Sequence, residues 1–222
     1  MKALVRKYRR EQPDARRDSL VEATIRCLAA NGHSGASVRR IAAEAGVSVG
    51  LINHHYASID ELIASAYEKV ALGIVRQLLE TMEDAPPSPR AKLSAFFRAS
   101  CSPPMLDPDL LSVWVVFWSM IRHSPVMHET QQRTFAEYRG VIERYLNAYA
   151  AEIGLIETDM RLPAIGLSAL LDGIWLELCL NPAAFSPEEG IALCEAWIDG
   201  LASGAHRPLL GGSVMPGANA AA

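Results

Sequence analysis

The chain has 222 residues, half of them apolar, which is enough to bury one large core or two small ones. Its four cysteines form no CxxC pair, and its charged amino terminus lacks an apolar h-region, which argues against a zinc site, a disulfide framework and a signal peptide. Residues 1–60 carry ten Lys and Arg against six Asp and Glu, whereas residues 61–222 carry eleven against nineteen, so only the amino-terminal part is expected to meet a polyanion.

Helix starts and stops recur along the chain, whereas alternating β-branched runs bounded by hairpin turns do not occur. We therefore predict an all-α protein. The first helix is expected over about residues 14–31, with Leu20 and Leu28 on its apolar stripe and Gly32 as its stop. Four basic residues precede it and form either a disordered tail without a role or an arm that contacts phosphates: Arg6, Lys7, Arg9 and Arg10.

Residues 37–56 are typical of two short helices joined by a glycine turn. Ser37 can cap the first helix, Gly46 supplies the turn and Ser48 can cap the second helix. The second helix is too short and too polar to be a core element on its own. An outside partner has to explain its exposed side, and the arrangement indicates a helix-turn-helix DNA reader.

Helical geometry assigns two faces to this second helix. Ile52 and Tyr56 fall on one face, which should pack inward, while Gly50, Asn53 and His54 fall on the other. Glycine inside a helix costs about 1 kcal/mol relative to alanine, so its presence predicts a close approach of DNA there.

Several polar side chains near this face can contact DNA. Asn53 can pair with adenine, and His54 and His55 can donate to bases or phosphates. Phosphate contacts are predicted from the capped end of the second helix and from Ser37, Arg39 and Arg40. The alternative is that the two arginines form only a solvated face and that the histidines are ordinary surface residues.

A second region of helices follows. Ser58 and Glu61 match a capping box that opens a helix to about Glu83, and the proline-rich stretch 85–89 ends it. Further helices are expected at about residues 91–100, 109–121, 126–153, 158–180 and 186–202. The helix at 109–121 is apolar on all sides, which places it inside a domain, and its apolar run is too short to span a bilayer.

We divide the chain accordingly. A DNA-binding domain with its basic arm occupies residues 1–60, a helical ligand-binding and dimerisation domain occupies 61–203, and 204–222 is a disordered tail. We expect a soluble, cytoplasmic protein with no membrane partner.

Residues 23–61 resemble the amino-terminal domain of TetR-family repressors, most clearly over 35–56 and 60–62. The resemblance implies a homodimer that binds a double-stranded DNA operator, nine or so helices, and a variable body that binds a small-molecule effector. One departure is Ile59, which stands where the family commonly has a phosphate-contacting lysine, so we expect a shallower salt dependence of DNA binding. By matching position the DNA contacts fall on Ser37, Arg39, Ser48, Gly50, Asn53, His54 and His55.

Within the body, residues 110–118 and 169–176 resemble the BetI-type branch, which represses choline-to-betaine genes. The resemblance makes a quaternary ammonium effector reasonable, because tryptophan faces attract such cations. The expected ligand-binding residues are Trp114, Trp118 and Trp175 together with Asp172 or Glu177. The alternative is that tryptophans at helical spacing only fill a core.

The family resemblance also implies that the last two helices of each subunit form a four-helix dimer interface. Small residues would let these helices approach closely, and larger ones would supply apolar area. The expected interface residues are Ala164, Ala169 and Gly173, with Leu167, Leu170, Ile174 and Trp197.

Other functions remain as alternatives. An enzyme is disfavoured because GxSxG, Walker, GxGxxG and HExxH motifs are missing from the sequence, and no cofactor or metal is expected. A regulator that responds to a different apolar ligand, or to oxidation of Cys101, Cys179 or Cys194, stays open. The sequence leaves undetermined the operator, the regulated genes, the effector and whether the effector releases or recruits DNA.

Overall fold

The computed structural model describes residues 2–35, 37–155 and 158–206, which form nine α-helices and one 3-10 helix, with no strand. The predicted all-α fold is confirmed over these residues. In chain order the elements are α1 (Lys2–Asn31), η1 (Gly32–Gly35), α2 (Val38–Glu44), α3 (Val49–His55), α4 (Ile59–Glu83), α5 (Pro89–Ser100), α6 (Pro108–Ile121), α7 (Pro125–Glu152), α8 (Arg161–Leu180) and α9 (Pro187–Ala202).

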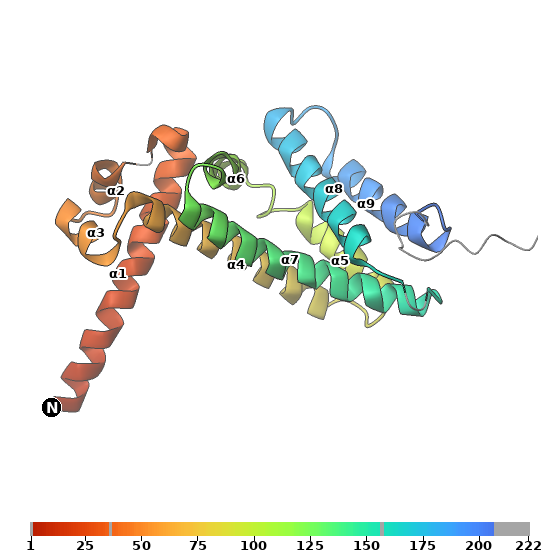
Figure 1. Cartoon of the computed structure of the whole chain (residues 1–222), viewed down its shortest axis with the longest axis horizontal. Coiled ribbons are helices and arrows are strands. Elements are labelled where there is room, and N and C mark those ends of the chain that lie inside the picture. Colours follow the sequence, from red (N-terminus) through yellow and green to blue (C-terminus); the bar gives the residue numbers. More distant parts are fainter. Residues whose placement is uncertain (1, 36, 156–157, 207–222) are drawn as a thin grey trace, which may run out of the picture.

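Helices α1 to α3 form a small domain at one end of the molecule (Figure 1). The side chain of Ser37 accepts from the amide of Arg40, and that of Ser48 accepts from the amide of Leu51, each at 3.3 Å. Between the two helices Gly46 has a φ of 66°, a left-handed conformation that favours glycine. The predicted helix-turn-helix geometry is therefore confirmed.

The first helix is longer than predicted. It begins at Lys2 instead of about residue 14, and its amino-terminal half projects away from the other helices (Figure 1). Most residues in this added stretch are good helix formers, so the helix continues past the apolar stripe that the prediction was based on.

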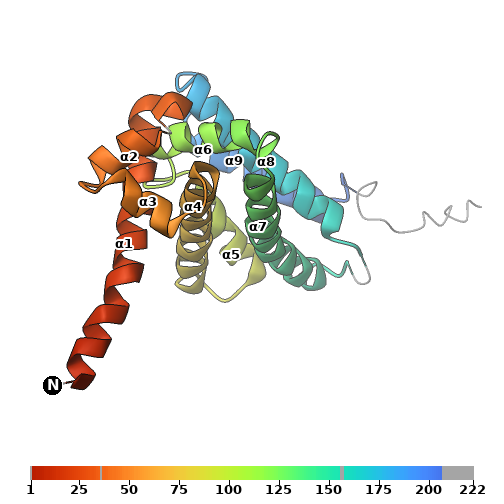
Figure 2. The same cartoon turned by 60° about the vertical axis from the view of Figure 1, so that its left-hand side comes forward.

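The body is built on α4 and α7, which lie side by side and run in the same direction (Figures 1 and 2). Ser58 caps α4 by accepting from the amide of Glu61 at 3.1 Å. The Glu61 carboxylate accepts from the amide of Ala57 at 2.6 Å, one residue earlier than the predicted capping box requires. Helix α4 packs on α1 as well as on α5 and α7, so it joins the small domain to the body.

Helix α6 is a core helix, as predicted, and it contacts α1, α7 and α8. Helix α8 is also long and apolar enough to cross a membrane by length and composition. Its inner side packs on α6, α7 and α9, and Leu167, Leu171 and Ile174 are buried there. This burial accounts for its apolar composition as that of a core helix.

The packing of α8 corrects part of the predicted dimer surface. Ala164, Leu167 and Ile174 are buried inside the chain, so they are not available to a partner. Ala169 and Gly173 are exposed on the opposite side of the helix. The large apolar side chains left exposed on the last two helices are Leu162, Leu180 and Leu193.

Helix α9 opens with the predicted capping box between Ser186 and Glu189. Just past its end, the ring of His206 stacks on Trp197 with 5.0 Å between ring centroids. His206 thus packs against α9, and residues 207–222 of the predicted tail lie outside the described residues.

Candidate DNA-reading face and aromatic cavity

Helix α3 is held by the two residues that the sequence assigned to its inner face. Ile52 is 1% exposed and Tyr56 is 7% exposed. On α1, Arg17 donates a 3.2 Å hydrogen bond to the carbonyl of His55, and its guanidinium lies 5.6 Å from the centroid of the Tyr56 ring. These contacts fix the carboxyl end of α3 on α1.

The opposite side of α3 is open to solvent. Gly50, Asn53 and His54 are exposed, while His55 is half-buried with its ring 5.3 Å from that of His54. A Cβ added to Gly50 would meet only the hydroxyl of Ser48, at 3.8 Å. The packing of the described residues therefore does not require glycine at this helical position, where alanine would have the higher helix propensity.

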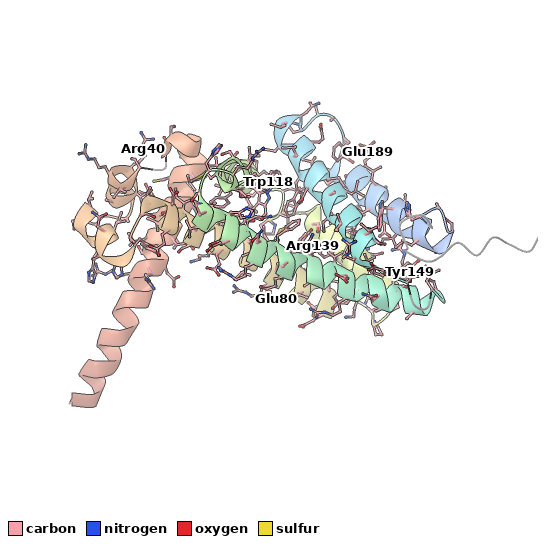
Figure 3. All side chains as sticks on the ribbon, viewed as in Figure 1. Arg40, Glu80, Trp118, Arg139, Tyr149 and Glu189 are labelled. Carbon is pink, nitrogen blue, oxygen red and sulfur yellow. The ribbon has the colours of Figure 1, made fainter. Side chains whose placement is uncertain are left out.

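Positive and hydroxyl groups flank this face. Arg39 and Arg40 are exposed, and neither forms an ion pair with an acidic side chain of the described residues. Arg40 points away from α2 into solvent (Figure 3). Ser37 and Ser48 are exposed and accept the capping hydrogen bonds, which leaves their O–H groups free to donate outward.

A second candidate site is a small cavity between α4, α6, α7 and α8, with a volume of about 20 Å³. We call it the aromatic cavity. Its walls are Tyr67, Ala71, Ile74, Val75, Trp114, Thr134, Phe135, Tyr138, Asp172 and Trp175.

Two tryptophans form one corner of the aromatic cavity. The rings of Trp114 and Trp175 meet edge to face, with centroids 6.0 Å apart at 85°. The indole of Trp175 donates to the carbonyl of Ser100 at 2.9 Å, which fixes its orientation. Tyr67 lies 5.5 Å from Trp114, centroid to centroid. The cavity is thus lined by ring faces and edges, as a site for an organic cation would be.

One carboxylate lies in this aromatic lining. Burial raises the pKa of Asp172 from 3.8 to about 6, and no cation of the described residues pairs with it. The indole N–H of Trp114 and the hydroxyl of Tyr138 are also buried without a hydrogen-bond partner in the described part of the chain. Both residues line the aromatic cavity, and buried polar atoms without a partner are often found at ligand sites.

Two of the residues expected to bind the ligand do not line this cavity. Trp118, labelled in Figure 3, does not line the cavity; it is half-buried, and its ring centroid lies 6.1 Å from that of Trp114. Glu177 is exposed, five residues beyond Asp172 on α8 and therefore on another side of the helix. The cavity lining also includes Tyr67, Phe135 and Tyr138, which were not among the ligand-binding residues expected from the sequence.

A larger, open groove of about 700 Å³ lies between the start of α6 and the α8–α9 connection. Phe185 is its one aromatic lining residue, and Glu189 is its one carboxylate. Glu189, labelled in Figure 3, accepts from the amide of Ser186 at 2.7 Å and is thus occupied in the α9 cap. None of the residues that line this groove has a buried, unpaired polar side-chain atom in the described part of the chain.

The cysteines have the character of core residues. Cys101 and Cys194 are buried, and burial raises their thiol pKa values to about 11 and about 12. Thiols with raised pKa values contain little reactive thiolate at neutral pH. This environment disfavours oxidation of these two residues as the regulatory signal.

Comparison with known families matches both parts of the chain. Residues 20–66 match the family described as "Bacterial regulatory proteins, tetR family", and residues 89–203 match "BetI-type transcriptional repressor, C-terminal". Among curated relatives, the HTH-type transcriptional regulator BetI of Pectobacterium carotovorum is 29% identical over 83% of this chain and 92% of its own length. BetI of Burkholderia thailandensis is 27% identical over 84% of this chain and 93% of its own length.

Solved structures agree. A protein from Pseudomonas aeruginosa PAO1 assigned as a transcriptional regulator is 48% identical, with a TM-score of 0.83 over 89% of this chain and 95% of its own. A transcriptional regulator from Rhodococcus sp. Rha1 is 26% identical, with a TM-score of 0.71 over 85% of this chain and 96% of its own. The chain therefore belongs to the TetR family of DNA-binding transcriptional regulators, which are not enzymes, and carries a BetI-type carboxy-terminal domain.

Proposed function

We propose that this regulator is a repressor released from a palindromic operator by a small organic cation of the choline type. The observation that carries the proposal is Asp172, a half-buried carboxylate without a cationic partner among the described residues, in a cavity lined by Trp114 and Trp175. A quaternary ammonium ion would offset the buried negative charge and place its methyl groups against the rings.

The unpaired donors support a ligand that also carries an oxygen. The indole N–H of Trp114 and the hydroxyl of Tyr138 can each donate to a ligand hydroxyl group. A solved structure from Saccharomonospora viridis, described as a complex with choline, shares this fold with a TM-score of 0.70 at 19% identity. Together with the BetI names of the curated relatives, it makes choline the first compound to test.

The volume of the aromatic cavity supports a switch. About 20 Å³ holds little more than one water molecule, so an organic cation has to move a wall. Tyr67, Ile74 and Val75 form one wall on α4, and the same stretch of α4 contacts α1 through the ion pair of Lys69 with Glu22. Displacement of α4 by the ligand would change the spacing of the two reading domains in a dimer, and ligand and DNA would then weaken each other's binding.

We expect the DNA bases to be contacted by residues on α3, namely Gly50, Asn53, His54 and His55. Phosphate contacts go to Ser37, Arg39, Arg40 and Ser48. The exposed outer sides of α8 and α9 would form the homodimer interface, so that two α3 helices read successive major grooves in the cytoplasm.

The decisive experiment selects genomic fragments with the purified protein and titrates choline against the best fragment by fluorescence anisotropy. Choline should release the DNA, whereas 3,3-dimethyl-1-butanol, its uncharged carbon analogue, should not. Equal release by both compounds would contradict the cation site. A lack of any bound fragment at low salt would contradict operator binding itself.

A further inference from the structure

An apolar side chain is exposed on the DNA-reading face. Val49, the first residue of α3, is 37% exposed. The other large apolar side chains with comparable exposure in the described part of the chain are Leu162, Leu180 and Leu193, all on α8 and α9. The proposed dimer interface would cover those three, but Val49 lies in the DNA-binding domain, away from that interface.

The neighbours of Val49 leave its methyl groups free to reach outward. Gly50 follows it without a side chain, and a Cβ there would meet nothing closer than the Ser48 hydroxyl at 3.8 Å. Asn53 lies four residues later and is exposed, so both side chains stand on one face of α3. In helix-turn-helix proteins the first residues of the reading helix meet the base edges.

We propose that Val49 is a specificity-determining residue that recognises the 5-methyl group of a thymine in each half-site. The thymine methyl is the apolar feature that the four bases present in the major groove, and small apolar side chains pair with it. Because Asn53 can bind an adenine from the same face, the recognised thymine should lie within a base pair or two of that adenine. The inference rests on the proposed DNA binding and adds the base that this position selects.

The test removes single methyl groups from the DNA. In a fragment selected by the wild-type protein, each thymine is replaced in turn by deoxyuridine, which differs only in lacking the 5-methyl group. We expect one symmetric pair of positions at which the replacement weakens binding. Affinity should fall about fourfold when one thymine of the pair is replaced and about fifteenfold when both are, because these factors correspond to the burial of one and of two methyl groups. Uracil at the other thymines serves as the internal control.

Two variants assign the effect to Val49. Val49→Ala should lose the sensitivity to uracil at that pair and bind the two DNAs equally. Val126→Ala removes the same two methyl groups from a half-buried site on α7 and should keep the sensitivity of the wild type. Because Val49 is exposed, its alanine variant should melt within a few degrees of the wild type.

Each alternative outcome overturns the inference. Binding that is indifferent to uracil at every thymine shows that no methyl group is recognised. Sensitivity that persists in Val49→Ala shows that another residue recognises the methyl group. If the wild-type protein binds no unmodified fragment, the proposed DNA function fails and the inference fails with it, whereas the first two results contradict the inference alone.

Discussion

Arg133 on α7 donates a 2.7 Å hydrogen bond to Glu68 on α4, and each residue is the sequence neighbour of one that lines the aromatic cavity. Tyr67 and Thr134 are those lining residues. The ion pair therefore ties together two walls of a cavity that is too small for the proposed cation. Loosening it should favour the wider form that a ligand needs.

We expect Glu68→Gln to raise the affinity for choline by up to about fivefold, the range of an exposed ion pair, while the free energy of unfolding changes by less than about 1 kcal/mol. The two side chains are 39% and 60% exposed, which keeps the stability effect small. Isothermal titration and thermal melting measure the two quantities. Glu44→Gln, which breaks the pair with Arg26 between α1 and α2 and leaves α4 unchanged, is the matched control and should leave choline affinity unchanged. Equal gains in both variants would contradict the role of the α4–α7 pair.

Asp172→Asn should change ligand binding and stability in opposite directions. Burial raises the pKa of Asp172 to about 6 in the folded protein, above its ordinary value of 3.8. As the pH rises between these values, the unfolded chain loses the proton first, so folded-state stability falls by about 2–3 kcal/mol and stays lower above about pH 6. The asparagine variant should therefore be more stable than the wild type at about pH 8 and similar to it at about pH 4.

The same substitution removes the carboxylate that we propose pairs with the cationic ligand. Choline affinity of the wild type should fall about tenfold for each pH unit below about 6, and the variant should bind weakly at every pH. Glu177→Gln provides the control, because Glu177 is an exposed carboxylate on the same helix and should alter neither property. A pH-independent affinity in the wild type would argue that Asp172 does not contact the cation.

Gly50→Ala should separate stability from DNA binding. A Cβ at this position meets no atom closer than 3.8 Å, so alanine should stabilise the protein by about 0.5–1 kcal/mol through helix propensity and the unfolded chain. The same methyl group would stand between α3 and DNA and should weaken operator binding at least tenfold. Ala43→Gly on the exposed side of α2 is the reverse control, expected to destabilise the fold with little effect on DNA. Unchanged operator affinity in Gly50→Ala would contradict a close approach of DNA to α3 at this position.

Much of the fold could be predicted because its signals are local. The caps at Ser37, Ser48 and Ser186 each depend on residues within three positions, and the apolar stripes need only one helix to be recognised. The start of α1 was misplaced because its basic residues are good helix formers that carry no apolar pattern.

The aromatic cavity depends on how helices pair, and a single sequence does not determine that pairing. Trp114 and Asp172 stand out in the sequence as unusual residues on apolar helices. Tyr67 and Tyr138 resemble ordinary core residues, and they line one cavity only because α4 packs against α7. The predicted dimer face was partly wrong because it too depends on which helices pack together. Leu167 fits an apolar interface by composition, yet it packs into the chain's own core.

Ile59 offers a gain-of-function test of the phosphate contact that the sequence lacks. It is half-buried at the first position of α4, next to the Ser58 cap and close in sequence to α3. Ile59→Lys should add one phosphate contact per subunit, so the plot of log affinity against log salt should steepen by about 2 for the dimer. Ile59→Gln removes the same apolar side chain without adding charge, and we expect it to keep the wild-type slope. A steeper slope in the glutamine variant, or a slope equal to that of the wild type in the lysine variant, would show that this position does not face the DNA backbone.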